Sequence, residues 1–525
     1  MPDLPQQDRP VPVCSLLFER PADGVRVFHE APEFFRDLNL DQIVAAVTAG
    51  RDEYDLAPFF HAPLQDASAI GYRHEVFRDL DAPALRERIG DFAQQMRSMR
   101  QHLERSATLR QRYQRESWFL DAVHVYGEAV RTLAADLARL EPRSRAFDTF
   151  GRFLASYVRS ERFTSLIEET ARVRGELMGL TYRLTIGDDR VTVGRPGAEP
   201  DYASEVRAAF DRFRRGAVED YRVAFRDDPE MDPVEAGVLE RVGLLYPDVF
   251  RRLDDSCARH ADYLDPTVAT FDREAQFYLG FLELVDRMRV AGLPFCYPEV
   301  SGSKDVRSRA SFDVALALKL VPLGSPVVVN DFELRGPERI IVVTGPNQGG
   351  KTTFARTFGQ LHHLAALGCL VPGSGARLSL HDQLWVQFER KEQLADLRGK
   401  LHDDLVRIRG ILGRATPRSV VILNEIFTST TARDALLLSL RVLEQLVRLD
   451  VLCVWVTFLD ELASSGESAV SMVSTVAPDD PAVRTFRIVR RRADGRAYAE
   501  AIAAKYGLSY DRLKERLARE SISPS

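Results

Sequence analysis

The sequence of 525 residues contains little cysteine, little lysine and no long apolar run. Its cysteines are scattered without a C-x-x-C spacing, so they give no sign of a disulfide framework or a zinc site. They are Cys14, Cys257, Cys296, Cys369 and Cys453. No apolar run approaches the roughly 20 residues that span a bilayer, and the N-terminus lacks an export signal. We therefore expect a cytoplasmic protein without a membrane partner.

Basic residues are not in excess. The 71 lysines and arginines face 77 aspartates and glutamates, which gives a formal net charge of −6. This balance argues against a uniformly basic nucleic-acid binder but leaves room for a local basic surface. Only 7 of the basic residues are lysines, the first being Lys304, so phosphate contacts upstream of it would come from arginine. Genomic base composition is the simplest explanation of that bias.

One run carries more chemistry than any other. Gly345-Pro-Asn-Gln-Gly-Gly-Lys-Thr-Thr353 fits the spacing G-x-x-x-x-G-K-S/T of a phosphate-binding loop. The apolar stretch 339–344 before it predicts a buried strand, and the stretch 354–367 after it predicts a helix. A strand–loop–helix context is what such a loop requires. The candidate nucleotide-binding residues are Gly345, Pro346, Asn347, Gln348, Gly349, Gly350, Lys351, Thr352 and Thr353.

These residue types suit ATP with Mg²⁺. Glycines let backbone N–H groups close around phosphates, and the N-terminus of the following helix adds a favourable dipole. Lys351 can reach the β- and γ-phosphates and assist catalysis, while Thr352 can offer its hydroxyl to Mg²⁺.

A second candidate group follows another buried strand, predicted over 418–423. Asn424 and Glu425 occupy the strand end that commonly carries an acidic pair in P-loop ATPases. Asn424 is a candidate metal-site residue that brings no charge, and Glu425 is the candidate general base. The alternative is that Glu425 only caps or pairs at a strand end.

A hydroxyl-rich loop comes directly after this pair. It consists of Thr428, Ser429, Thr430 and Thr431, and a helix is predicted from Ala432 onward. Hydroxyls at a helix N-terminus can bind an anion, or they can simply cap the helix.

The chain as a whole predicts an α+β multidomain protein. Residues 1–80 read as short helices that form the N-terminal part of a core. Residues 81–292 read as a helical lever or arm with a β-hairpin near 182–193, and residues 293–525 read as an α/β P-loop domain with a C-terminal helical segment. Within the arm, Leu85, Ile89, Phe92, Met96, Met99 and Leu103 alternate steps of four and three, the heptad pattern of a long packed helix.

Further elements are predicted around these landmarks. Helices are expected over 202–225 and 233–290. In the C-terminal region, strands are expected over 293–300, 314–321, 326–330 and 451–456, and apolar runs of this kind suit a parallel sheet buried on both faces.

The region 293–517 resembles the ATPase domain of the MutS family of DNA mismatch-repair proteins, a branch of the ABC-type ATPases. Thr344 to Thr353 reads TGPNQGGKTT, close to the family's TGPNMGGKST. Asn330 lies at the end of Val327-Val-Val-Asn330, where the family contacts the nucleotide base, so it joins the candidate nucleotide-binding residues. Other family-like segments are Gly368–Pro372, Asn424–Ile426 and Ala497–Leu508.

The resemblance implies a homodimer that binds ATP and DNA. In the family the loop that corresponds to 428–431 reaches the nucleotide of the neighbouring subunit, so these residues are candidates for action in trans. The region before the phosphate loop is shorter than in full mismatch-repair members, by about the length of the mismatch-reading and connector domains. We therefore expect double-stranded or branched DNA to be bound through its shape and backbone, without a mismatch-reading wedge.

Two departures from the family pattern keep alternatives open. Asn424 replaces the family's metal-site aspartate, and Phe458 replaces its histidine after the sheet. Turnover could therefore be slow. The first hypothesis is a MutS-like ATPase that dimerises and binds DNA; the alternatives are an ATP-dependent protein scaffold or switch, and a weakly active pseudo-ATPase, with no direct role on DNA.

Overall fold

The computed structural model describes residues 14–20, 28–187, 190–197, 231–388, 399–480 and 483–493. The chain divides into two compact units. Unit 1 contains residues 82–143 and 147–272, and unit 2 contains residues 14–81, 144–146 and those from Arg273 onward. The division 1–80, 81–292 and 293–525 drawn from the sequence stays a prediction.

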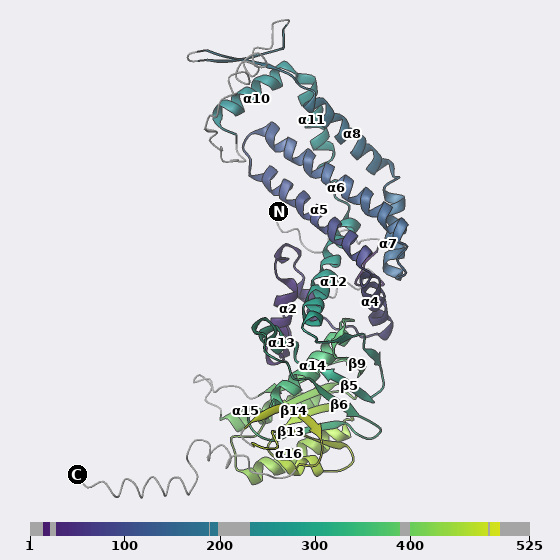
Figure 1. Cartoon of the computed structure of the whole chain (residues 1–525), viewed down its shortest axis with the longest axis vertical. Helices are drawn as coiled ribbons and strands as arrows, with labels where there is room; N and C mark the ends of the chain where they lie inside the picture. Colours follow the sequence, from purple (N-terminus) through teal and green to yellow (C-terminus); the bar gives the residue numbers. More distant parts are fainter. Residues whose placement is uncertain are drawn as a thin grey trace, which may run out of the picture. The chain divides into compact units, whose positions relative to one another are not determined.

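Unit 1 is mainly helical (Figure 1). Its elements are α5 (Pro83–Thr108), α6 (Arg112–Leu140), α7 (Arg145–Tyr157), α8 (Glu161–Met178), β1 (Arg183–Ile186), β2 (Val191–Gly194), α10 (Pro233–Leu245), α11 (Pro247–Arg259) and the start of α12 (Pro266–Val290). The helices predicted over 233–290 are confirmed as α10, α11 and α12. The helix predicted over 202–225 lies outside the described residues.

The heptad prediction is confirmed by α5. Its heptad positions from Leu85 to Met99 are buried, and the helix packs along α6 (Figure 1). Pro83 begins α5 at a position where its missing N–H costs nothing. Aromatic side chains fill the neighbouring core, where the rings of Phe150 and Phe271 stack with centroids 3.7 Å apart.

The predicted hairpin is also confirmed. Strands β1 and β2 pair antiparallel, with Arg183 opposite Gly194 and Ile186 opposite Val191. Leu184, Ile186 and Val191 are exposed on it. The turn residues 188–189 lie outside the described residues.

The described residues of unit 2 form helices and three sheets. Its helical elements are α1 (Phe34–Asp37), α2 (Leu40–Thr48), η3 (Asp52–Tyr54), α3 (Ala57–His61), α4 (Ala67–Leu80), the rest of α12, α13 (Val314–Leu320), η4 (Val321–Leu323), α14 (Lys351–Ala366), α15 (Lys400–Arg414), α16 (Ala432–Arg448) and η5 (Asp460–Ser464).

The described strands of unit 2 are β3 (Phe295–Cys296), β4 (Glu299–Ser301), β5 (Val306–Ser311), β6 (Asn330–Leu334), β7 (Ile340–Thr344), β8 (Val371–Pro372), β9 (Gly375–Ser379), β10 (Leu384–Phe388), β11 (Val420–Asn424), β12 (Leu452–Val456), β13 (Ala469–Val476) and β14 (Arg484–Arg490). The largest sheet has the order β10-β11-β12-β7-β13-β14. Strands β10 to β13 in this order are parallel, and β14 is antiparallel to β13. A four-stranded sheet, β4-β9-β5-β6, and a β3–β8 pair complete the unit.

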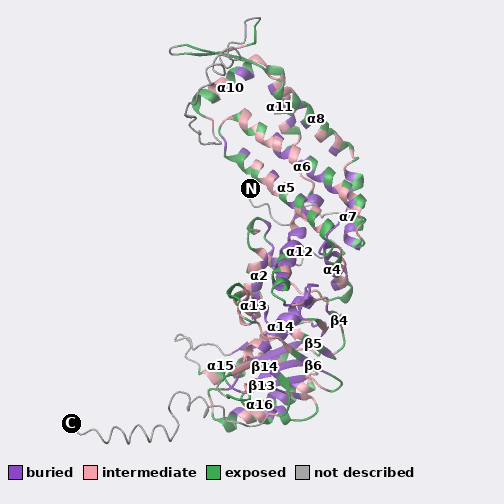
Figure 2. Cartoon of the chain, in the orientation of Figure 1, coloured by how far each residue is buried: buried purple, intermediate pink, exposed green. Residues whose placement is uncertain are grey.

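Every residue of β7, β11 and β12 is buried, as expected for a sheet covered on both faces, and α14, which packs on this sheet, is largely buried as well (Figure 2). On one face, alternate residues such as Val342, Leu423 and Trp455 pack with α15, α16 and η5. The intervening residues lie against α14. Gly359 permits this close packing, because a Cβ at that position would lie only 2.7 Å from Ile422 Cδ1. A mixed α/β fold is therefore observed.

Two strand predictions in this unit are wrong. Residues 314–321 form α13 and the start of η4. Alanines favour the helix, Asp313 caps it through the N–H of Leu316, and Gln360 accepts from the N–H of Val314. The strand expected over 326–330 begins only at Asn330 and runs to Leu334.

Other strand predictions hold in part or in full. The stretch 293–300 splits into β3 and β4, while 339–344, 418–423 and 451–456 correspond to β7, β11 and β12 within one or two residues. Across the part of the chain that the structure describes, no helix is both long enough and apolar enough to cross a membrane.

Candidate functional site at the carboxyl edge of the large sheet

The register of the large sheet brings the candidate residues together. Asn424 lies beside Val456, and Val456 lies beside Val343, so β11, β12 and β7 end side by side. Neighbouring strands are separated by about 4.8 Å. Since parallel strands carry their ligand-binding loops at the carboxyl edge, the segments that begin at Gly345, Glu425 and Thr457 emerge at one edge.

The loop after β7 has the backbone of an anion cradle. Gly345, Gln348 and Gly350 have positive φ angles of 116°, 59° and 87°. Gly350 is the N-cap of α14, and no side chain caps that helix end among the described residues. The first N–H groups of α14 are therefore available to an anion, as the phosphate-loop prediction requires.

Strand β13 also explains two of the glycines. A Cβ on Gly345 would lie 2.9 Å from the backbone oxygen of Ser474, and a Cβ on Gly349 would lie 2.2 Å from Ser474 Oγ. The buried Ser474 hydroxyl donates to the Gly349 carbonyl at 2.6 Å. The loop is thus braced by a strand that follows it by more than 100 residues, and no motif in the sequence pointed to Ser474.

Lys351 begins α14 and is buried. Its Nζ donates to the carbonyl oxygens of Gly345 and Pro346, each at 3.0 Å. Burial lowers the pKa of Lys351, the Glu425 carboxylate acts in the opposite direction, and Arg484 lowers it further. The charges of Glu425 and Lys351 therefore attract each other across the edge of the sheet.

Thr352 and Asn424 meet directly. The Thr352 hydroxyl donates to Asn424 Oδ1 at 2.9 Å, which joins the first turn of α14 to the end of β11. Hydroxyl and amide oxygens suit a hard cation such as Mg²⁺. The two candidate metal-site residues are thus adjacent, although neither carries a charge.

Glu425 sits in a bend directly after β11. It has a positive φ of 53°, and its N–H donates to the Val456 carbonyl at 2.9 Å. Phe427 has a positive φ of 62°, and its N–H donates to the buried carboxylate of Asp404 at 3.1 Å. Asp404 from α15 therefore fixes the turn that carries Glu425, a role that sequence reasoning missed because the two residues are far apart in the chain.

Residues Thr428 to Thr431 contribute a helix cap and a contact with α15. Thr431 caps α16 by accepting from the N–H of Asp434 at 3.2 Å, which fits the simple capping interpretation for that residue. Thr428 accepts from Lys400 Nζ at 3.2 Å. Thr428 and Ser429 are exposed, and Thr430 is half-buried. An action of this loop in trans stays a prediction.

Comparisons with known proteins show that the segments at this edge of the sheet are similar to part of MutS. A family profile described as MutS domain V matches residues 341–511. The DNA mismatch repair protein MutS of Chlorobaculum tepidum is 25% identical over 273 residues, which cover 51% of this chain and 30% of that protein. The DNA mismatch repair protein MutS of Chloroflexus aurantiacus is 25% identical over 253 residues, or 47% of this chain and 24% of that protein.

The chain is related to the MutS family. The matched regions cover less than a third of each of these MutS proteins. The family match includes the phosphate loop, Asn424 and Glu425, and it continues into Ala497–Leu508, which lies outside the described residues.

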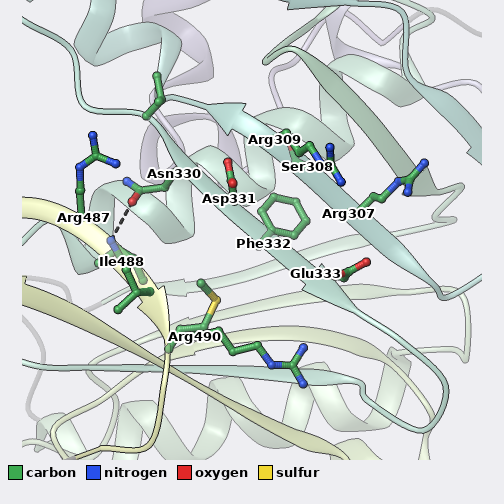
Figure 3. Close-up of a pocket in the computed structure, with 13 residues that line it drawn as sticks. Arg307, Ser308, Arg309, Asn330, Asp331, Phe332, Glu333, Arg487, Ile488 and Arg490 are labelled. Carbon is green, nitrogen blue, oxygen red and sulfur yellow. Dashed lines mark hydrogen bonds between the residues drawn. The ribbon is translucent and has the colours of Figure 1, made fainter.

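A cavity of about 680 Å³ lies between strands of the four-stranded sheet and strands of the large sheet. Strands β5 and β6 form one wall, and β13 and β14 form the other (Figure 3). Its charged lining consists of Arg307, Arg309, Arg487, Arg490, Asp331 and Glu333. Phe486 directly precedes the lining residue Arg487, and its backbone oxygen would lie 3.6 Å from a Cβ on Gly350, so β14 connects the cavity wall to the phosphate loop.

Asn330 belongs to the wall of this cavity. Its Oδ1 accepts from the N–H of Ile488 at 2.7 Å, the bond drawn in Figure 3. Its Nδ2 donates to the Phe486 carbonyl at 3.2 Å. Both ends of the amide are thus engaged by β14, so Asn330 ties β6 to β14; its contact with a nucleotide base stays a prediction.

Proposed function

We propose that this chain is a MutS-type ATPase that binds ATP with Mg²⁺, forms a homodimer and binds DNA through its shape and backbone. The observation that carries the proposal is the phosphate-loop geometry at the carboxyl edge of the sheet, in a region related to MutS. There Lys351, the open N-terminus of α14 and the Thr352–Asn424 pair converge.

The nucleotide contacts follow from the chain's own donors. The N–H groups of the loop and of the first turn of α14 donate to phosphate oxygens, and Lys351 neutralises their charge. The nucleoside part fits the neighbouring cavity, whose volume of about 680 Å³ lies within the usual range for ligand pockets. Asn330 keeps the two walls of that cavity together.

Hydrolysis depends on Glu425. Its carboxylate is close enough to Lys351 to raise that residue's pKa against the effect of burial, so it lies on the side where the terminal phosphate is neutralised. There it orients a water molecule and accepts its proton. Thr352 and Asn424 would hold Mg²⁺, which would supply positive charge to the phosphates.

The DNA and dimer parts of the proposal rest on the relationship to MutS. The relatives carry the name DNA mismatch repair protein. The exposed hairpin β1–β2 of unit 1 offers Arg183 and Arg190, which suit phosphate contacts. The exposed part of loop 428–431 suits contact with a neighbouring subunit.

One observation favours a second candidate, a nucleotide-gated switch with very slow turnover. The residue that meets Thr352 is the uncharged Asn424, so the cation site has one carboxylate fewer than the acidic pair expected of a P-loop ATPase. A protein scaffold without a role on DNA receives no support from the comparisons.

The deciding experiment measures ATP turnover of the wild type and of Glu425→Gln, each with and without duplex and branched DNA. We expect DNA-dependent hydrolysis that falls at least about 100-fold in Glu425→Gln, because a positioned base contributes that much, while ATP binding persists. Tight ATP binding without turnover under every condition would favour the switch. Absence of DNA retention at low salt, with and without ATP, would refute the DNA part.

A further inference from the structure

An aromatic ring contacts the lysine of the phosphate loop. Phe458 follows β12 after Thr457, and its ring centroid lies 4.5 Å from Lys351 Nζ. Although most large apolar side chains of the large sheet are buried, Phe458 is 49% exposed. The ring is therefore held beside a cation and is free of the close packing that fixes the core.

The contact with Phe458 adds to the hydrogen bonds that already surround the Lys351 ammonium. A lysine ammonium has three N–H donors, and two of them bind the carbonyl oxygens of Gly345 and Pro346. The face of Phe458 attracts the remaining positive charge through the quadrupole of the ring. Lys351 is thus satisfied by the protein alone, and a phosphate has to compete with this arrangement.

The order of the strands indicates which phosphate of a bound nucleotide would compete with Phe458 for Lys351. Strand β12 lies between β7 and β11, so residues that follow β12 emerge between the phosphate loop and the Asn424–Glu425 pair. Under the proposed function, on which this inference rests, the terminal phosphate of ATP lies between Lys351 and Glu425. The ring of Phe458 therefore stands on the side of Lys351 that the terminal phosphate approaches.

We propose that Phe458 is a gating residue that competes with the terminal phosphate of a nucleoside triphosphate for Lys351. The half-exposed ring has to move from the ammonium before a triphosphate is fully bound, whereas a diphosphate requires less displacement. The ring therefore lowers affinity for triphosphate relative to diphosphate and sets a threshold of ATP concentration for loading.

The test compares Phe458→Leu, which keeps apolar bulk but removes the π face, with Phe458→Tyr, which keeps the ring. Dissociation constants of the full chain are measured for a non-hydrolysable ATP analogue and for ADP, both with Mg²⁺. A cation–π contact in a partly desolvated site corresponds to roughly 5- to 30-fold in affinity. We expect Phe458→Leu to tighten binding of the ATP analogue by about that factor and to change ADP binding less, whereas Phe458→Tyr retains the wild-type ratio of the two constants.

The outcomes separate this inference from the proposed function. An unchanged ratio in Phe458→Leu, or the same change in the leucine and tyrosine variants, would overturn the gating role. Failure of the wild type to bind either nucleotide would instead overturn the proposed function. Thermal unfolding of each variant without nucleotide checks that the fold is retained, and Lys351→Ala provides the reference for a loop without its cation.

Discussion

The two units differ in where the backbone departs from ordinary conformations. Among the described non-glycine residues of unit 1, only Glu141 has a clearly positive φ. The described part of unit 2 has eight such residues, namely Asn39, Asp55, Ala310, Gln348, Glu425, Phe427, Asp450 and Phe486. Each costs on the order of 1–3 kcal/mol, and several of them surround the phosphate loop.

The units also treat buried charge differently. In unit 1, Glu169 is bound by Arg259 at 2.6 Å and by His260 at 2.9 Å. In unit 2, His362, His363 and His381 are buried, and burial lowers the pKa of each. Unit 1 thus pairs this buried carboxylate with basic side chains, whereas unit 2 keeps its buried histidines neutral and holds several strained residues near the candidate site.

The largest expected effect tests whether the two units unfold separately. Phe150 in unit 1 and Phe77 in unit 2 are both fully buried, so Phe150→Ala and Phe77→Ala should each cost about 3–5 kcal/mol of unfolding free energy. Differential scanning calorimetry should show each variant lowering the transition of its own unit. A single transition that both substitutions shift equally would mean that the two units unfold together.

The next effect separates the units by ligand. ATP should raise the unfolding temperature of unit 2 by mass action, and Lys351→Ala should weaken ATP binding about 100-fold, because a buried charge partner of the phosphates is lost. The control is Arg152→Ala in unit 1, which removes an exposed ion pair with Asp148 of little worth. Equal ATP binding by Lys351→Ala and wild type, measured by calorimetric titration, would refute the assignment of the loop.

A fall in pH should lower the stability of unit 2 more than that of unit 1. In unit 2, burial lowers the pKa of His74, His362 and His363 from 6.5 to about 4. Their neutral forms are favoured by folding, so this stability is present above pH 6.5 and is lost as the pH falls towards 4. Burial raises the pKa of Glu274 to about 7, which opposes the loss in part.

In unit 1, burial and the hydrogen bond that protonated Glu116 donates to Asp254 raise the pKa of Glu116 to about 7. Its protonated form is favoured by folding, so unit 1 gains stability as the pH falls from 7 to 4.5. Unfolding temperatures measured at pH 7.5 and pH 5 should therefore fall for unit 2 and hold or rise for unit 1. His381→Leu, which removes ring nitrogens without a hydrogen-bond partner among the described residues, should reduce the fall; an unchanged slope would rule out that histidine as a source.

The smallest expected effect concerns the cation site of unit 2. Asn424→Asp adds a carboxylate beside Thr352 and should raise Mg²⁺ affinity about tenfold, or roughly 1.4 kcal/mol, because the cost of burying the new carboxylate offsets part of its attraction to the divalent ion. The readout is the Mg²⁺ dependence of ATP binding. If affinity and turnover both stay unchanged, another group already supplies that charge.

Local patterns in the sequence predicted much of both units. The heptad of α5, the hairpin and the strands β7, β11 and β12 depend on periodicity and turn residues that neighbouring positions supply. The strand expected over 314–321 failed because an apolar run of that length fits either a strand or a helix. Asp313 and Gln360 decided for the helix, and Gln360 lies 46 residues from Val314, the residue that it binds.

Short-range spacing predicted the phosphate-loop motif, the hydroxyl and acidic residues that accompany it, and the long helices of unit 1. Tertiary structure alone decided that Ser474 braces the loop, that Asp404 fixes the turn after Glu425 and that Phe458 covers Lys351. These contacts depend on the order and register of parallel strands. Because parallel strands are joined by long crossovers, residues that meet at their carboxyl edge are distant in the chain and leave no local pattern.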